Sequence, residues 1–237
     1  MIAGIAVISI AFAVQQAWPR EVSQSYRSPN TEIHIVEGDL LAQDCNIVIG
    51  MSDAFDTEVP DIISQTSVQS QFLTRVYDDD RDALDRDLTS ALTRYAPRRT
   101  FPPGQRTGKQ CAYEIGTVAS IRQQRKFYFC LAYTEMSDRH EAQATVDGIW
   151  KSLNCLWDEV RSVSNGDTVS IPVIGGGQAR ISQQLPAQDS IRLITLSYML
   201  ASRKTKVTGR LNVVVRPEDV QNLDMLELQA FLRSLRG

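Results

Sequence analysis

The stretch IPVIGGGQAR at residues 171–180 decides the fold most clearly, because a short apolar run leads directly into three consecutive glycines. An apolar run of this length is typical of a buried central strand. Consecutive glycines let backbone N–H groups converge on an anion, because no side chain blocks the approach. The stretch therefore predicts either a loop that cradles a pyrophosphate or a plain tight turn after a strand.

Two better-known phosphate motifs are excluded. A Rossmann fingerprint would need glycine where Arg180 stands and a helix that opens at the same point. Residues 104–109, GQRTGK, resemble a Walker A loop, but three residues separate the glycines instead of four. Gln110 also stands where that loop needs Ser or Thr. The chain is therefore not predicted to be a dinucleotide-binding dehydrogenase or a P-loop nucleotidase.

Strands alternate with helices along the rest of the chain. Short β-branched or apolar runs predict strands, and leucine or isoleucine at helical spacing predicts helices. The predicted strands lie at residues 31–36, 47–49, 115–121, 126–132, 168–174 and 211–215. The predicted helices lie at residues 80–95, 141–163 and 189–202, with a last one capped by Asp224. This alternation predicts a layered α/β/α domain.

The first predicted strand is followed by EGDL at residues 37–40. Gly38 permits a turn there, and Asp39 then stands at the carboxyl end of a strand, where open α/β sheets bind ligands. A carboxylate in this place can accept hydrogen bonds from an adenine amino group. The alternative is an aspartate that caps a helix or an Asx turn.

Composition narrows the function classes. The 237 residues carry a net charge of −3, which argues against a dedicated nucleic-acid binder. The four cysteines include no CxxC pair, so a zinc site is not expected, and a reducing compartment is favoured. The acidic run at residues 78–80 is interpreted as a solvated helix start rather than a metal site.

Neither His34 nor His140 lies in a sequence motif that would pair it with a catalytic nucleophile, so we predict no catalytic residue. The basic loop at residues 98–110 is either a lid over a phosphate or a solvated surface loop.

The first nineteen residues differ from the rest. Residues 2–14 are apolar except for Gly4 and Ser9, and counting on to Trp18 gives about seventeen residues, at the lower edge of a membrane span. Arg20 and Arg27 suit a cytoplasmic flank. A signal peptide and a buried first helix are the alternatives. We favour a membrane helix, which predicts an inner (cell) membrane protein with a cytoplasmic domain. The predicted organisation is a transmembrane segment at 1–19, a linker at 20–30 and a folded domain at 31–237.

Several motifs in order resemble the macro domain family. They are VEGDL at 36–40, the strand at 47–49, YEIGTV at 113–118 and the loop at 171–177, and the similarity extends over residues 31–235. More narrowly, the chain is similar to the Thoeris anti-phage effectors that join N-terminal membrane helices to a macro domain. The resemblance implies a three-layer α/β/α fold with a mixed central sheet. It also implies a site for ADP-ribose or a related nucleotide, with no further cofactor.

The same resemblance implies roles for particular residues. Asp39 would meet the adenine amino group, and the glycine loop would hold the diphosphate through its N–H groups. Ser52 or Asp53 would contact the distal ribose or its substituent. The implied ligand-binding residues are Asp39, Leu40, Ser52, Asp53, Gly175, Gly176, Gly177, Gln178 and Arg180.

Two departures from the family shape the functional hypothesis. Catalytic macro domains carry Asn-Ala-Ala-Asn where this chain has Ile49-Gly50-Met51-Ser52, so ADP-ribose hydrolysis is not expected. The apolar start also provides one short membrane segment where the effectors usually carry two. The leading hypothesis is a sensor of a nucleotide made from NAD by a TIR-domain partner. Binding would drive self-association and membrane disruption. The alternatives are an ADP-ribosylhydrolase and a plain ADP-ribose-binding module with a secretion signal.

Overall fold

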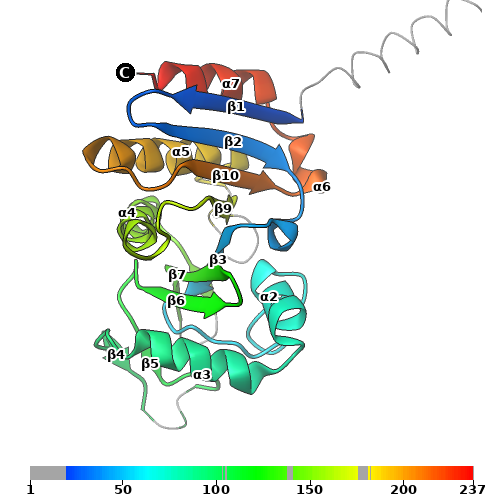
Figure 1. Ribbon diagram of the computed structural model, residues 1–237. Helices are drawn as coiled ribbons and strands as arrows, with labels where there is room; N and C mark the ends of the chain where they lie inside the picture. The colour runs from blue at the N-terminus through cyan, green and yellow to red at the C-terminus, as the bar shows by residue number, and fades with distance from the viewer. Residues whose placement is uncertain are drawn as a thin grey trace, which may run out of the picture.

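The computed structural model describes residues 20–102, 104, 106–137, 141–175, 181 and 183–236 (Figure 1). The predicted membrane helix at residues 1–19 lies outside these residues, as do Gly176, Gly177, Gln178 and Arg180. Within the part of the chain that is described, no helix has both the length and the apolar character that a bilayer crossing requires.

A mixed sheet forms the centre of the domain, with strands in the order β1-β2-β10-β9-β3-β7-β6. The five strands from β2 to β7 are parallel, whereas β1 and β6 pair antiparallel at the two edges. A short strand β8 extends β7. The bounds are β1 Glu21–Tyr26, β2 Thr31–Glu37, β3 Asn46–Ser52, β6 Val118–Gln123, β7 Lys126–Met136, β8 Ala142–Gln143, β9 Val169–Pro172 and β10 Arg210–Val215.

Helices cover both faces of this sheet, as Figure 1 shows. On one face α4 (Val146–Val163), α5 (Ala187–Lys204) and α7 (Met225–Ser234) bury the larger apolar core. On the other face α2 (Val68–Tyr77) and α3 (Arg81–Leu92) cover β3, β7 and β6 over a second core. The short elements are η1 Leu40–Ala42, β4 Arg99–Thr100, β5 Cys111–Ala112 and α6 Pro217–Val220. The predicted three-layer α/β/α fold with a mixed sheet is confirmed.

The sequence pattern explains which strands lie in the centre. In β3, Ile47 and Ile49 belong to the core under α2 and α3, whereas Val48 belongs to the core under α4. A strand that is buried on both faces reads as a continuous apolar run, and this is why residues 47–49 were recognisable from the sequence.

The predicted linker at residues 20–30 is wrong. Glu21–Tyr26 forms the edge strand β1, which pairs with β2 from Glu21 opposite Val36 to Tyr26 opposite Thr31. The strand alternates, with Val22 and Tyr26 buried against the core, and the Tyr26 hydroxyl donates to the Leu232 carbonyl at 2.7 Å. Two apolar residues among six left too weak a pattern to predict a strand. The first described strand therefore lies within the predicted linker.

The helix ends refine two other predictions. The helix predicted at 141–163 begins at Val146, where the Thr145 hydroxyl caps the Gly148 N–H. In the acidic run, Asp80 caps α3, but Asp78 and Asp79 have positive φ angles of 50° and 62° in the turn before it. Asp224 caps α7 as the capping-box spacing predicts.

Candidate functional site

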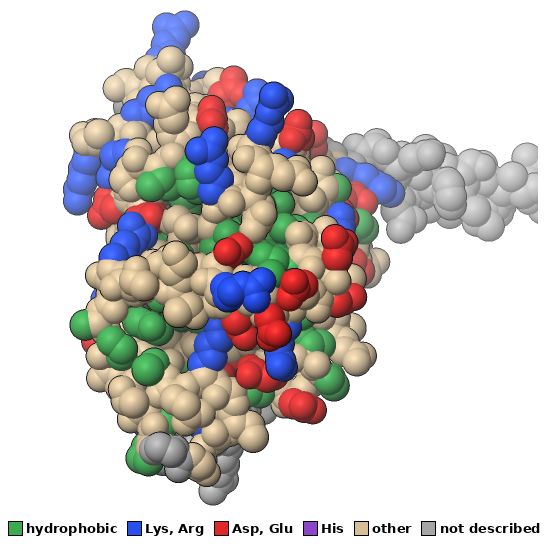
Figure 2. Space-filling view, turned by 60° about the horizontal axis from the view of Figure 1, so that its bottom comes forward, with side chains coloured by type: hydrophobic (Ala, Val, Ile, Leu, Met, Phe, Trp, Pro, Cys, Tyr) green, Lys and Arg blue, Asp and Glu red, His purple; other side chains and the backbone are tan. Residues whose placement is uncertain are grey.

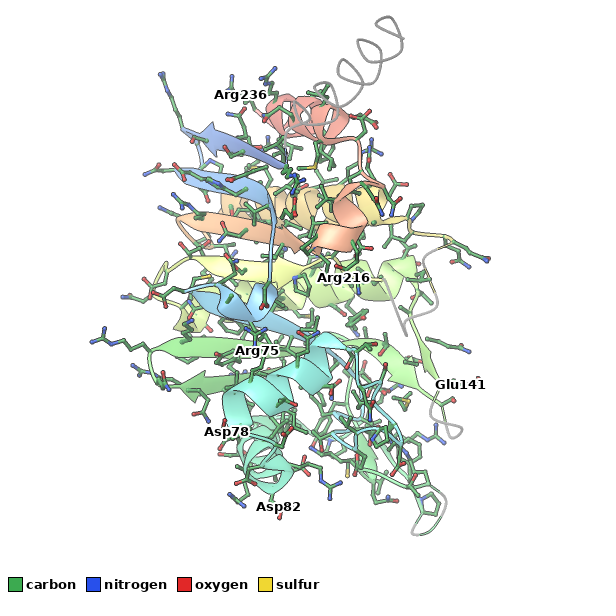
Figure 3. All side chains as sticks on the ribbon, turned by 90° about the vertical axis from the view of Figure 1, so that its right-hand side faces the viewer. Arg75, Asp78, Asp82, Glu141, Arg216 and Arg236 are labelled. Carbon is green, nitrogen blue, oxygen red and sulfur yellow. The ribbon has the colours of Figure 1, made fainter. Side chains whose placement is uncertain are left out.

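A cleft of about 640 Å³ opens at the carboxyl ends of the parallel strands. Its floor consists of the segments that follow or end β2, β10, β9, β3 and β7, and residues 62–71 form one wall. Figure 3 views the molecule from the side of this edge and labels Arg75 and Arg216. The volume lies within the range of small-molecule sites, and the carboxyl edge is where open α/β sheets bind ligands.

Asp39 stands at the β2 end of the cleft. One carboxylate oxygen accepts from the Leu41 N–H at 2.9 Å and so caps η1, and the other accepts from Arg75 of α2 at 2.6 Å. Partial burial alone would raise the pKa of Asp39, but the hydrogen bonds from Arg75 and from Leu41 lower it below its usual value. Asp39 is therefore a fixed, ionised acceptor at the cleft wall. Leu40 lines the cleft beside it.

The middle of the cleft lies at the end of β9, where Ile174 leads into Gly175. Gly175 has a φ of +95°, and a Cβ there would lie 3.0 Å from the Ile181 side chain. The N-terminus of α5 meets the cleft at Ala187, and its N-cap Pro186 makes no side-chain capping bond. The N-terminus of an α-helix favours anions through its N–H groups and its dipole. This section can hold a negatively charged group.

Gly50, Ser52 and Tyr133 form the far end, where β3 lies beside β7. A Cβ on Gly50 would lie 2.6 Å from a carbon of the Tyr133 ring, so the ring rests on the glycine backbone. Burial raises the pKa of Tyr133 to about 12, which keeps its hydroxyl protonated. Among the described residues, the buried Ser52 hydroxyl finds no hydrogen-bond partner. A buried hydroxyl without a partner in a cleft wall is suited to bond a ligand.

Asp53 does not line the cleft. Its carboxylate accepts from the Met136 N–H at 2.8 Å and from Arg98 at 3.3 Å, with only 2% of the side chain exposed. Burial raises the pKa of Asp53 despite these two bonds. Rather than line the cleft as the resemblance implies, Asp53 follows the end of β3 and ties β7 to the segment before β4 through Met136 and Arg98.

The described residues of the basic loop at 98–110 do not line the cleft, so they give no support to a lid. The Arg106 guanidinium pairs with Asp56 at 2.5 Å, and both side chains are completely buried. Lys109 pairs with Asp85 of α3 at 2.8 Å, and the Arg99 guanidinium lies 4.3 Å from the centre of the Phe101 ring. None of these three cations lines the cleft. The alternative of a surface loop agrees with most of its described residues, which are exposed, although Phe101 and Arg106 are buried.

Sequence reasoning missed part of the site. The wall at residues 62–71 has no recognisable motif, because it mixes a turn with the start of α2. Arg216, Glu218 and Asp219 follow β10 and line the cleft at the Asp39 end. Asp39 was selected because it is a polar residue directly after a buried strand. The stretch RPED at 216–219 meets the same criterion after β10 and could have been selected in the same way.

Groups of residues that could ligate a metal are not found in the described part of the chain. No group of three His, Cys, Asp or Glu there could hold a metal ion. On the face drawn in Figure 2, acidic and basic side chains lie intermingled. His34 lies on β2 between Glu21 and Glu32, with each ring nitrogen 3.2 Å from a carboxylate oxygen, and does not line the cleft.

The profile of the family described as "Thoeris protein ThsA, Macro domain" matches residues 33–216. This chain belongs to that family. A curated relative, Thoeris protein ThsA of Bacillus amyloliquefaciens (strain Y2), is 21% identical over 208 residues, which are 85% of this chain and 68% of that protein.

Solved macrodomains share the fold of this family member. The Oceanobacillus iheyensis macrodomain with bound MES aligns with a TM-score of 0.58 at 13% identity, covering 90% of this chain and 99% of that one. The same macrodomain with ADP aligns with a TM-score of 0.57 at 12% identity, covering 91% and 100%. Likeness at these identities shows the fold alone.

Proposed function

We propose that this chain is an effector of anti-phage defence whose macro domain binds a nucleotide signal derived from ADP-ribose. The observation that carries the proposal is the order of chemical groups along the cleft. An ionised acceptor stands at the β2–β10 end, and a helix N-terminus and a glycine turn stand at β9. At the β3–β7 end stands a hydroxyl that has no partner among the described residues.

This order matches the order of groups in ADP-ribose. Asp39 accepts from the adenine amino group, Gly175 after β9 and the start of α5 face the diphosphate, and Ser52 faces the distal ribose. From β2 to β7 the strand order spans four spacings of about 4.8 Å, or about 19 Å in all, which suits an elongated ligand. The solved macrodomain with ADP supports a nucleotide in this fold.

Binding without hydrolysis fits the far end of the cleft. In the stretch Ile49-Gly50-Met51-Ser52, Ile49 and Met51 are buried in the core, and Ser52 offers only a hydroxyl. The charged residues among the described cleft lining are Asp39, Arg216, Glu218 and Asp219, which all lie at the opposite end. A general base near the distal ribose is therefore not in evidence within the described lining. An ADP-ribosylhydrolase remains the alternative to be tested.

The membrane part of the proposal rests on the sequence. The apolar run in residues 1–19 is the proposed inner-membrane helix, with the macro domain cytoplasmic. Because β1 begins at Glu21, only Arg20 lies between that run and the sheet. A single span has no polar lumen, so membrane disruption requires several copies. A nucleotide made by a TIR-domain partner would favour this homo-oligomer only by binding the assembled state more tightly.

Calorimetric titration of the full-length protein in detergent with ADP-ribose tests the proposal. We expect saturable binding and no release of ribose products on prolonged incubation. Turnover of ADP-ribosylated protein would support the hydrolase instead, and a folded protein that binds neither ADP-ribose nor ADP would contradict both.

A truncated protein tests the membrane part of the proposal. Removal of residues 1–19 should leave nucleotide binding intact and abolish toxicity in cells. A truncated protein that still kills would contradict the membrane mechanism alone.

A further inference from the structure

Arg216 lies beside Asp39 at the β2–β10 end of the cleft. It follows β10 directly and occupies the N-cap position of α6, and its neighbour Val215 pairs with Glu37 of β2. The Gly38 N–H donates to the Val215 carbonyl at 2.9 Å, which ties the two strand ends together. Asp39 and Arg216 therefore line the same end of the cleft, where a base bonded to Asp39 would meet the segment that begins with Arg216.

Two carboxylates contact nitrogen atoms at the edge of the Arg216 guanidinium. Its Nε donates to Asp219 at 2.7 Å, and one terminal nitrogen lies 3.4 Å from a Glu218 oxygen. The side chain is 60% exposed, so the carboxylates fix the plane of the guanidinium without burying it. They also offset its charge, which weakens any attraction for a distant phosphate. What stays available to a ligand is the flat face.

A nucleobase in this cleft needs such a face. Of the described residues that line the cleft, Tyr133 is the one aromatic side chain. It lies on β7, three strand spacings or about 14 Å from β10, which is too far to cover a base at Asp39. Nucleobases bound by proteins commonly stack on aromatic rings or on arginine planes.

We propose that Arg216 is the stacking residue for the base, its guanidinium plane lying on the purine whose amino group Asp39 accepts. This inference rests on the proposed function, since it assumes a nucleotide in the cleft. It makes Arg216 a determinant of base affinity, with Asp219 as the residue that positions it. Stacking, unlike an ion pair with phosphate, depends on a flat group and not on charge.

Two substitutions separate these roles. R216Y keeps a flat surface and removes the charge, whereas R216K keeps the charge and removes the plane. Titration of the full-length protein with ADP-ribose should give R216Y an affinity within about 3-fold of wild type. R216K and R216A should each lose about 5- to 150-fold, the range for one lost stacking contact. The matched controls are R210Y and R210K, because Arg210 starts the same strand, pairs with Glu32 and does not line the cleft.

Each outcome is decisive. If R216K binds like wild type and R216Y does not, Arg216 contacts phosphate and the stacking proposal is wrong. If all three variants bind like wild type while D39A does not, Arg216 has no role in a site that still binds nucleotide. If wild type binds neither ADP-ribose nor ADP, the proposed function fails and this inference fails with it. Melting temperatures of the variants confirm that each protein is folded.

Discussion

Arg106 and Asp56 form an ion pair with a nitrogen–oxygen distance of 2.5 Å and with both side chains completely buried. The second oxygen of Asp56 accepts from the Lys109 N–H at 2.8 Å. A Cβ on Gly108, whose φ is +84°, would lie 2.5 Å from Asp56 and 2.6 Å from Ile62. Ile62 lines the cleft. Gly108 thus lies close to both Asp56 and the cleft residue Ile62, which links the buried pair to the cleft wall, although neither member of the pair lines the cleft.

Removing one member of this pair should destabilise the domain strongly. We expect D56A to lower the free energy of unfolding by about 3–5 kcal/mol, because it leaves the Arg106 guanidinium buried without its counter-charge. Denaturant titration measures the change. The matched control is D158A, since Asp158 pairs with Arg161 at the surface and such pairs contribute at most about 1 kcal/mol. Equal effects of the two substitutions would show that the buried pair has no special role.

Asp39 should determine the preference for adenine. We expect D39A to weaken ADP-ribose binding by about 1–3 kcal/mol, the range for one hydrogen bond that involves a charged group. Wild type should also bind the hypoxanthine analogue more weakly, because that base lacks the amino group. Calorimetry measures both affinities. Equal affinity of wild type for the two bases would contradict the role of Asp39 as the amino acceptor.

The affinity for ADP-ribose should be flat from about pH 8 down to about pH 5. The pKa of Asp39 is lowered by Arg75 and Leu41, so the accepting carboxylate loses its charge only when the pH falls through that depressed value. R75M removes one of these donors and raises the pKa of Asp39, so its affinity should begin to fall at a higher pH. The other cleft carboxylates, Glu218 and Asp219, stay paired with Arg216 in both proteins. A wild-type affinity that already falls between about pH 7 and about pH 5 would be evidence against an ionised Asp39.

The far end of the cleft can be tested separately from the base end. We expect G50A to weaken ADP-ribose at least about 10-fold but to leave ADP within about 3-fold, because the added Cβ displaces the Tyr133 ring where only the distal ribose lies. S52A, which removes the unpartnered hydroxyl without adding volume, should show the same selectivity with a smaller loss. Equal losses for ADP and ADP-ribose would mean that the ligand does not lie along the cleft in the proposed order.

The sequence predicted the centre of the domain better than its edges. Ile47 to Ile49 lie between two cores, so their burial was visible as an uninterrupted apolar run. The edge strand β1 is buried on one face only, and its six residues carry just Val22 and Tyr26 as apolar signals. Local caps such as Asp224 were predictable because the cap and its N–H partner are three residues apart.

The site residues likewise divide into those that a local sequence pattern predicts and those that depend on partners distant in sequence. Asp39 could be selected because it directly follows a buried strand, and the structure places it in the cleft wall. Asp53 differs from Ser52 by one position, but that step turns its side chain toward Met136 and Arg98. The burial of Arg106 depends on Asp56, fifty residues away in sequence, and no local pattern reports such a partner.

Hydrogen exchange of the full-length protein with and without ADP-ribose tests the central claim most directly, because it locates the ligand on the sheet. The account predicts slower exchange in the segments at the carboxyl ends of the strands, at residues 38–41, 50–52, 172–175 and 214–219. Segments at the opposite ends of the strands, such as 122–126 and 205–210, should exchange unchanged and serve as the internal control. Saturating ADP-ribose that leaves the first set unchanged, or that protects only the second, would contradict nucleotide binding in this cleft.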